Sequence, residues 1–374
     1  MDRKIKGKII GISVLVVAFI TFAVLYAIKS VRESIRVNVI FPIISFMTKL
    51  TNNFSFSLFE VFMFLLVLAV LILLILGIIN FVKKNKIGGL NKFLSVVIIL
   101  LVFGLDYYIM VGTIYKREEL PILSNENYTS EKYVEIIKKY NEEMEDIAQK
   151  VDKDESGFLV NPYSDNEIKN EILKAYKESN LNSYKEKYFL DCLSTAKSII
   201  SSKIMSLNGI TGITFIPLGE ANYNKDTLFV DKVYSIAHEL AHTIGVMDEE
   251  EANVLALFVL LSSDNIYLKY VGYYFSCNQA YSVLILLNDT EAKKEFQIND
   301  IFIKESERRE EFWNENNKLE KVGNFINDLY LKLQGKGGTD SYKSNSKYTY
   351  DSETKMYSVE SFSKMQRMIF TIYD

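Results

Sequence analysis

The 374-residue sequence predicts an α-helical membrane anchor of three transmembrane helices, followed by a mainly α, α+β soluble domain with a small sheet. Charge divides the chain, because residues 1–113 carry 12 Lys and Arg against 4 Asp and Glu, whereas residues 114–374 carry 31 against 43. The first part contains apolar stretches long enough to span a bilayer, and the second has helix-spaced apolar residues among charges. We therefore expect a transmembrane region over 1–113 and a separately folded domain over 114–374.

The three predicted transmembrane helices cover about residues 9–28, 58–82 and 93–111. Each is close to the length of about 20 apolar residues that the hydrocarbon core requires. Lys and Arg concentrate before the first helix and in the loop 83–92, which predicts a cytoplasmic amino terminus by the positive-inside rule. Three crossings then place the soluble domain outside, and a cytoplasmic domain is the alternative. Asp106, near the end of the third helix, is expected to be interfacial.

Composition excludes several classes of function. The acidic soluble domain lacks the basic footprint that nucleic-acid binding requires, so we expect no nucleic-acid partner and take the lipid bilayer as the first partner. Cys192 and Cys277 are too few for a disulfide framework or a Cys-based zinc site. We expect two buried free thiols, and a single disulfide is the alternative.

The soluble domain is predicted to begin with helices between residues 118 and 203. A short β-branched and aromatic run at 210–217 ends at Pro217 and is predicted to form an edge strand. The remaining predicted elements are helices at about 232–244, 249–262, 266–287 and 301–333 and an irregular tail at 339–374.

One motif in the soluble domain indicates a catalytic metal site. The only two histidines of the chain, His238 and His242, flank Glu239 in a His-Glu-Leu-Ala-His motif on a predicted helix. Residues four apart lie on one helix face, so both imidazoles can bind one tetrahedral Zn2+. Glu239 lies too far round the helix to be a ligand but can reach a metal-bound water as general base. The competing interpretation is two histidines that only pack in the core.

The third metal ligand is predicted in the acidic run that follows. A short turn brings the first turn of the next helix level with His242, and Glu249 is the preferred ligand, with Asn253 behind it on the same face. Glu251 and Asp248 are the alternatives. A capping box formed by Asp248 and Glu251 is the purely structural interpretation of these acids.

These residues resemble two families. Glu249, Ala252 and Asn253 after the histidine motif resemble the Glu-x-x-Ala-Asp/Asn element of gluzincin-type zinc peptidases, in which the first Glu is the third ligand. The chain more closely resembles an uncharacterised family of bacterial membrane proteins with a metallopeptidase motif. Further matching segments are 41–45, 56–60, 104–107, 219–222, 270–273, 327–331 and 341–342. The resemblance implies a zincin-like soluble domain and a multi-pass protein of the bacterial cytoplasmic membrane.

The predicted function is a membrane-anchored zinc metallopeptidase acting on peptide or protein substrates, including substrates near the membrane surface. A strand at 213–216 is placed to hold an extended peptide by β-augmentation. Tyr270 and Tyr273 are candidate donors to the oxyanion. Charged residues flank the histidine helix and argue against an intramembrane protease. A non-catalytic metal-binding scaffold or sensor is the alternative from a different class.

Overall fold

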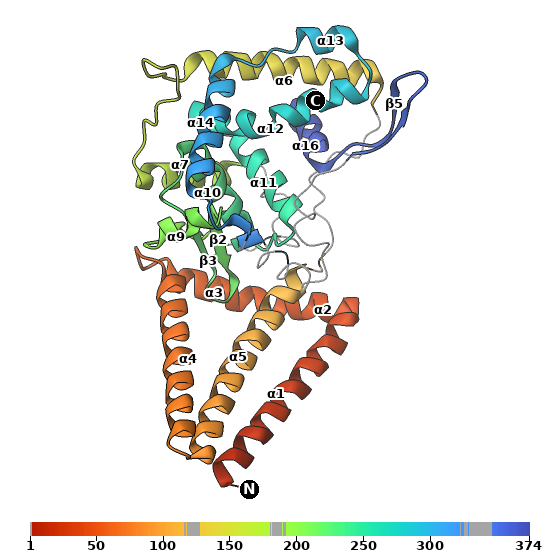
Figure 1. Ribbon diagram of the computed structural model, residues 1–374. Coiled ribbons are helices and arrows are strands. Elements are labelled where there is room, and N and C mark those ends of the chain that lie inside the picture. Colours follow the sequence, from red (N-terminus) through yellow and green to blue (C-terminus); the bar gives the residue numbers. More distant parts are fainter. Residues whose placement is uncertain are drawn as a thin grey trace. The chain divides into compact units, whose positions relative to one another are not determined.

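The computed structural model describes residues 2–115, 117, 128–179, 181, 189, 192–321, 323, 324, 328 and 346–374. The chain forms two compact units. Unit 1 comprises Met1–Arg117 and Phe215–Glu220, and unit 2 comprises Glu118–Thr214 and Ala221–Asp374. Helices dominate both units, and the described residues also form two small sheets (Figure 1). The predicted combination of a mostly helical chain, small sheets and three long apolar helices near the amino terminus is confirmed.

Unit 1 contains the three helices of the described residues that are long and apolar enough to cross a membrane, and these helices indicate a membrane protein. They are α1 (Arg3–Ala27), α4 (Leu58–Val82) and α5 (Lys86–Tyr115). α4 matches its predicted range, whereas α1 and α5 are longer than predicted. The observed helices are longer because helical hydrogen bonding continues into the polar residues at their ends. The sequence prediction covered only the apolar residues that suit the hydrocarbon core of a bilayer. Between α1 and α4 lie α2 (Lys29–Ile35), the π-helical segment η1 (Arg36–Ile40) and α3 (Phe41–Thr51).

The core of unit 2 is built on three consecutive helices near the predicted ranges, α10 (Phe229–Thr243), α11 (Glu249–Leu261) and α12 (Ile266–Leu286). α11 packs against both of its neighbours, and α12 also packs against α6. Most of their apolar residues are fully buried in one continuous core. The other helices are α6 (Ser130–Lys150), α7 (Asp165–Glu178), α9 (Ser202–Leu207), α13 (Thr290–Glu295), α14 (Asp300–Asn316) and α16 (Lys364–Tyr373).

A three-stranded sheet precedes α10. It is formed by β1 (Lys197–Ser198), β2 (Gly212–Phe215) and β3 (Glu220–Tyr223), with the short helix η3 (Ile216–Leu218) between the last two. The strand order is β1-β3-β2, and β1 pairs with β3 in parallel. β2 therefore lies at an edge, as predicted for this run.

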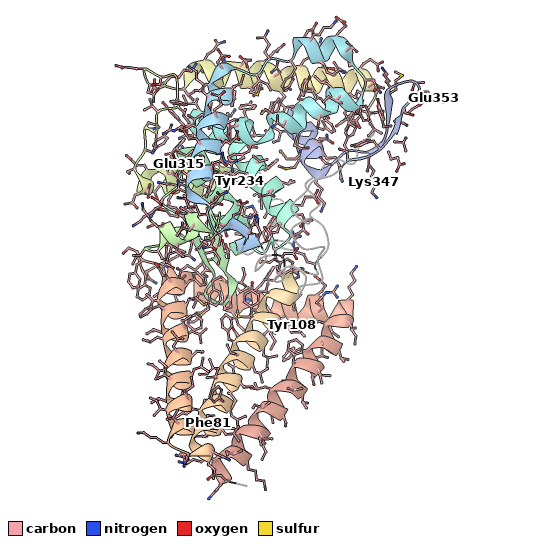
Figure 2. The ribbon with its side chains drawn as sticks, in the orientation of Figure 1. Phe81, Tyr108, Tyr234, Glu315, Lys347 and Glu353 are labelled. Atoms are coloured by element: carbon pink, nitrogen blue, oxygen red, sulfur yellow. The ribbon has the colours of Figure 1, made fainter. Side chains whose placement is uncertain are left out.

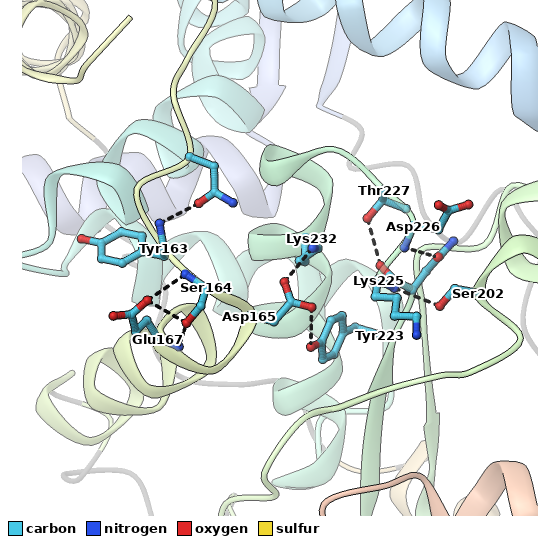
Figure 3. Close-up of polar contacts among 12 residues, drawn as sticks. Tyr163, Ser164, Asp165, Glu167, Ser202, Tyr223, Lys225, Asp226, Thr227 and Lys232 are labelled. Atoms are coloured by element: carbon cyan, nitrogen blue, oxygen red, sulfur yellow. Dashed lines mark hydrogen bonds and ion pairs between the residues drawn. The ribbon is translucent and has the colours of Figure 1, made fainter. Parts of the chain in front are cut away.

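The start of α7 connects the sheet to α10 (Figure 3). Ser164 and Glu167 form a capping box that fixes the first turn of α7. The Asp165 carboxylate in that turn pairs with the Lys232 ammonium of α10 at 2.8 Å and accepts a hydrogen bond from the Tyr223 hydroxyl of β3 at 3.2 Å. The Asp165 side chain thus links α7, β3 and α10, and these contacts hold α10 beside the sheet.

A buried carboxylate anchors α10 to α14. Asp231 is 2% exposed and accepts hydrogen bonds from Arg309 Nε at 2.7 Å and Trp313 Nε1 at 3.0 Å. The predicted helix over 301–333 is wrong as one continuous helix, because α14 ends at Asn316, and the described residues 320, 321, 323, 324 and 328 are helical again. Asn side chains compete with helical hydrogen bonding, so an Asn pair favours a helix end. Residues 329–333 of the predicted range lie outside the described residues.

The prediction of an irregular tail over 339–374 is wrong for residues 347–373, and residues 339–345 lie outside the described part of the chain. β4 (Lys347–Asp351) and β5 (Met356–Ser361) form an antiparallel hairpin, labelled at Lys347 and Glu353 in Figure 2. β4 is exposed along its whole length, and in β5 only Tyr357 and Val359 are half-buried, so the burial signal of the hairpin is weak. α16 is short but begins with a capping box and packs on α6, α11 and α12.

Candidate metal centre

The histidine motif lies on α10, which reverses into α11 through a short turn. Gly245 has a φ of +98°, the left-handed conformation that ends many helices, and its amide donates to the His242 carbonyl at 3.0 Å. Asp248 then caps α11 by accepting a hydrogen bond from the Glu251 amide at 3.2 Å. The turn brings the first turn of α11 against α10, so Glu249 lies within reach of both histidines.

His238, His242 and Glu249 come together in one group. One potential ligand atom from each lies within 4.8 Å of the others. Glu249 Oε2 is 3.2 Å from His238 Nε2 and 3.5 Å from His242 Nε2. Ligands bonded to a tetrahedral zinc ion at about 2.0–2.1 Å lie about 3.3 Å from one another. The two nitrogens and one oxygen could therefore hold a metal ion, and these three residues are here called the metal-binding group.

Hydrogen bonding orients the two imidazoles differently. His242 Nδ1 lies 2.6 Å from the Val246 carbonyl oxygen, which can only accept, so Nδ1 donates there and the ring is held with Nε2 turned toward Glu249. His238 Nδ1 is buried and has no hydrogen-bond partner among the described residues. Both rings thus present Nε2 to the same point, the arrangement that binding of one ion requires.

The charges of this group are strongly coupled. Burial alone would lower the pKa of His242, but the adjacent Glu249 carboxylate raises it to about 9. Burial alone would raise the pKa of Glu249, but the two imidazoles hold it well below its usual range. A negative carboxylate held between two imidazoles is an electrostatic environment in which a divalent cation can replace bound protons.

Glu239 lies next to this group but is not part of it. Its side chain is 6% exposed, and its Oε2 accepts a hydrogen bond from the Thr214 hydroxyl at 2.7 Å. Burial raises the pKa of Glu239, although the two imidazoles and Thr214 act in the opposite direction. A buried carboxylate that holds a proton more readily than a surface Glu has the property expected of a general base.

The alternative third ligands have other partners. Asp248 is the cap of α11, and Glu251 lies with its Oε1 3.9 Å from the ammonium of Lys364 on α16. The group of His, Asp and Glu side chains found among the described residues contains Glu249 and neither alternative. The arrangement thus agrees with the capping role for Asp248 and favours Glu249 as the third ligand.

Tyr234, which is labelled in Figure 2, is a residue near the site that was not predicted from the sequence. This tyrosine lies on α10 one turn before His238, and its hydroxyl donates to Asn253 Oδ1 on α11 at 2.7 Å. The bond joins the two helices that supply the metal-binding group. The four-residue spacing from Tyr234 to His238 could have revealed it, because such residues share a helix face.

The two tyrosines predicted as oxyanion donors lie in the core of unit 2. Tyr270 is fully buried and stacks on Phe302 with ring centroids 4.8 Å apart. Tyr273 is also fully buried, and its hydroxyl lies 2.6 Å from that of Tyr373 and 3.2 Å from Glu143 Oε2. An oxyanion role for either therefore stays a prediction.

Cys192 and Cys277 do not form a disulfide, which confirms the prediction that they do not pair. Cys277 is buried and Cys192 is only half-buried, so the predicted burial is confirmed only for Cys277.

The chain belongs to the family described as a protein of unknown function, DUF3810, whose model matches residues 36–349. The match covers most of the chain, including most of unit 1 and the whole metal-binding group, and it confirms the resemblance to an uncharacterised family. No curated protein and no solved structure matches the chain.

Proposed function

We propose that this chain is a membrane-anchored zinc metallopeptidase that hydrolyses peptide bonds. The observation that carries the proposal is the division of roles around α10. His238, His242 and Glu249 converge on one point, whereas Glu239 stays outside that group beside Thr214. The three converging residues would hold Zn2+, and when bound the ion would supply a Lewis acid for the water and the peptide carbonyl.

The chain's own residues would then handle the proton and the substrate. Glu239 would take a proton from the attacking water as the new C–O bond forms and pass it to the amine nitrogen as the C–N bond breaks. The Val246 carbonyl would keep the ring of His242 in its binding orientation. Edge strand β2, which carries Thr214, would bind an extended peptide by strand pairing.

The alternative is a metal-binding scaffold or sensor that cleaves nothing. A structural zinc is usually closed by four protein ligands, whereas a catalytic zinc keeps one position open. The group found among the described residues has three members, which supports the peptidase. α10 is not among the three helices apolar enough to span a membrane, which supports a site outside the hydrocarbon core over an intramembrane protease.

Metal removal tests the reaction class. We expect the purified full-length protein to cleave dye-quenched casein, and we expect 1,10-phenanthroline to abolish this cleavage because the three predicted ligands leave zinc accessible to a chelator. Removal of the chelator and addition of one equivalent of Zn2+ should restore the rate. Cleavage that persists after the zinc content has fallen to zero would show that the activity does not use this site.

We further propose that unit 2 acts outside the cytoplasmic membrane of a bacterium, because basic residues concentrate in the first turns of α1 and around the turn from α4 to α5. Alkaline phosphatase fused after Asp374 is expected to be active, and green fluorescent protein at the same position is expected to be dark. The same reporters fused after Lys84, between α4 and α5, should give the opposite pattern. Fluorescence at Asp374 would place the domain in the cytoplasm.

A further inference from the structure

Edge strand β2 contacts the predicted general base with two residues on one face. Thr214 donates from its hydroxyl to Glu239 Oε2 at 2.7 Å. Gly212 lies two residues earlier, on the same face of the strand. A Cβ at position 212 would lie 2.5 Å from Glu239 Oε1 and would also clash with the hydroxyl of Ser235. The strand can approach α10 this closely only with glycine at 212, and Thr214 then holds the carboxylate.

The chain passes from unit 2 into unit 1 directly after Thr214. Residues Phe215–Glu220, here called the anchored loop, are part of unit 1, and the chain re-enters unit 2 at Ala221. On α3, the Thr48 hydroxyl donates to the Gly219 carbonyl at 3.1 Å, and the Thr51 hydroxyl donates to the Leu218 carbonyl at 3.3 Å. These bonds fix the middle of the anchored loop within unit 1.

Both ends of the anchored loop are held by the long apolar helices. The Glu220 carboxylate is fully buried and accepts hydrogen bonds from the amides of Leu58 at 3.2 Å and Phe59 at 3.5 Å. These amides open α4, where a negative charge is favourable. At the other end, the Phe215 ring lies 5.1 Å from that of Phe59 and 6.2 Å from that of Phe103 on α5. The anchored loop is therefore held within unit 1 at both of its ends and in its middle.

Resting on the proposed peptidase function, we propose that the anchored loop positions the general base, so that the spanning helices control the catalytic rate. A single peptide bond separates Phe215, fixed in unit 1, from Thr214, which holds Glu239. A hydrogen bond of 2.7 Å tolerates little displacement, and misplacing a catalytic group by about 1 Å can cost about a hundredfold in rate. Thr214 and Gly212 are positioning residues for Glu239, and Glu220 acts through them.

The first test concerns Thr214 in the full-length, zinc-loaded protein, with dye-quenched casein as the probe. Thr214→Val is expected to lower kcat by about ten- to a hundredfold, with KM and zinc content unchanged. Thr214→Ser keeps the hydroxyl and should restore kcat to within about threefold of wild type. Equal kcat values for the valine and serine variants would overturn the positioning role.

The second test concerns the anchored loop. Glu220→Ala removes the acceptor for both α4 amides and should lower kcat by about tenfold with zinc retained, whereas Glu220→Gln keeps an acceptor oxygen and should lose less. Asn53→Ala is the matched control, because Asn53 is exposed and bonds only within its own segment, to the carbonyls of Lys49 and Leu50. If Glu220→Ala does not fold, Thr48→Val is used in its place, because it removes the hydrogen bond to the Gly219 carbonyl and leaves the Glu220 carboxylate intact.

Hydrogen exchange gives a readout that needs no substrate. In Glu220→Ala, the amides of residues 210–216 are expected to exchange faster than in wild type, because the strand has lost an anchor. Unchanged exchange and unchanged kcat in Glu220→Ala would overturn the coupling. A wild-type protein whose casein cleavage is absent, or is unaffected by Glu239→Gln, would instead refute the peptidase function itself.

Discussion

Glu239→Gln is expected to lower kcat for casein cleavage by about a thousandfold while zinc remains bound. Gln has the shape of Glu but cannot take a proton from water at neutral pH. Glu239 lies outside the metal-binding group, so its replacement removes no ligand. The measurement is the cleavage rate together with the zinc content of the same preparation.

Glu250→Gln is the matched control for this substitution. Glu250 lies in the same acidic run, on the first turn of α11, but its carboxylate faces Lys364 at 3.3 Å and is not in the metal-binding group. Its replacement should change kcat by less than about twofold, as expected for a partly exposed ion pair. A Glu239→Gln protein that keeps both its zinc and its full rate would contradict the proposed mechanism.

Glu249→Ala is expected to weaken zinc binding by more than about a hundredfold, beyond the loss typical of removing a residue that only supports a ligand. Glu249 Oε2 lies within 3.5 Å of both imidazoles, so its loss removes the one anionic donor of the group. Competition with a fluorescent zinc chelator measures the affinity, and activity should fall in parallel.

Two neighbouring acids serve as controls for the third ligand. Glu251→Ala should leave zinc affinity within about threefold of wild type, well below the effect of losing even a supporting residue. Asp248→Ala should cost about 1 kcal/mol of stability through loss of a helix cap, with zinc affinity retained. Loss of zinc in Glu251→Ala with zinc kept in Glu249→Ala would mean that the third ligand is misassigned.

The elements that sequence predicted best are those with a strong local pattern. α4 is apolar along most of its length, and α12 has the apolar content of a buried helix, so both were predicted close to their observed ranges. The hairpin of β4 and β5 was missed because β4 is exposed on both faces and β5 half-buries only Tyr357 and Val359. Helix ends such as Asn316 depend on single side chains that compete with the backbone.

In the candidate site, too, the local contacts could be predicted from the sequence and the long-range contacts could not. His238, His242 and Glu249 lie within one short helical hairpin, so residue spacing was enough to bring them together. Thr214 reaches Glu239 across 25 positions, and Glu220 reaches Leu58 across 162. No local period encodes such pairs, because they arise only when the strand packs on α10 and the anchored loop packs in unit 1.

Metal content of the purified, detergent-solubilised protein tests the central claim most directly. We predict about one zinc per chain in wild type, since the three-residue group binds a single tetrahedral ion, and loss of this zinc in His238→Ala, which folds but lacks one imidazole. Folded wild-type protein that contains no zinc and takes up none when it is added would contradict the account. The histidine motif would then be a packing feature of α10.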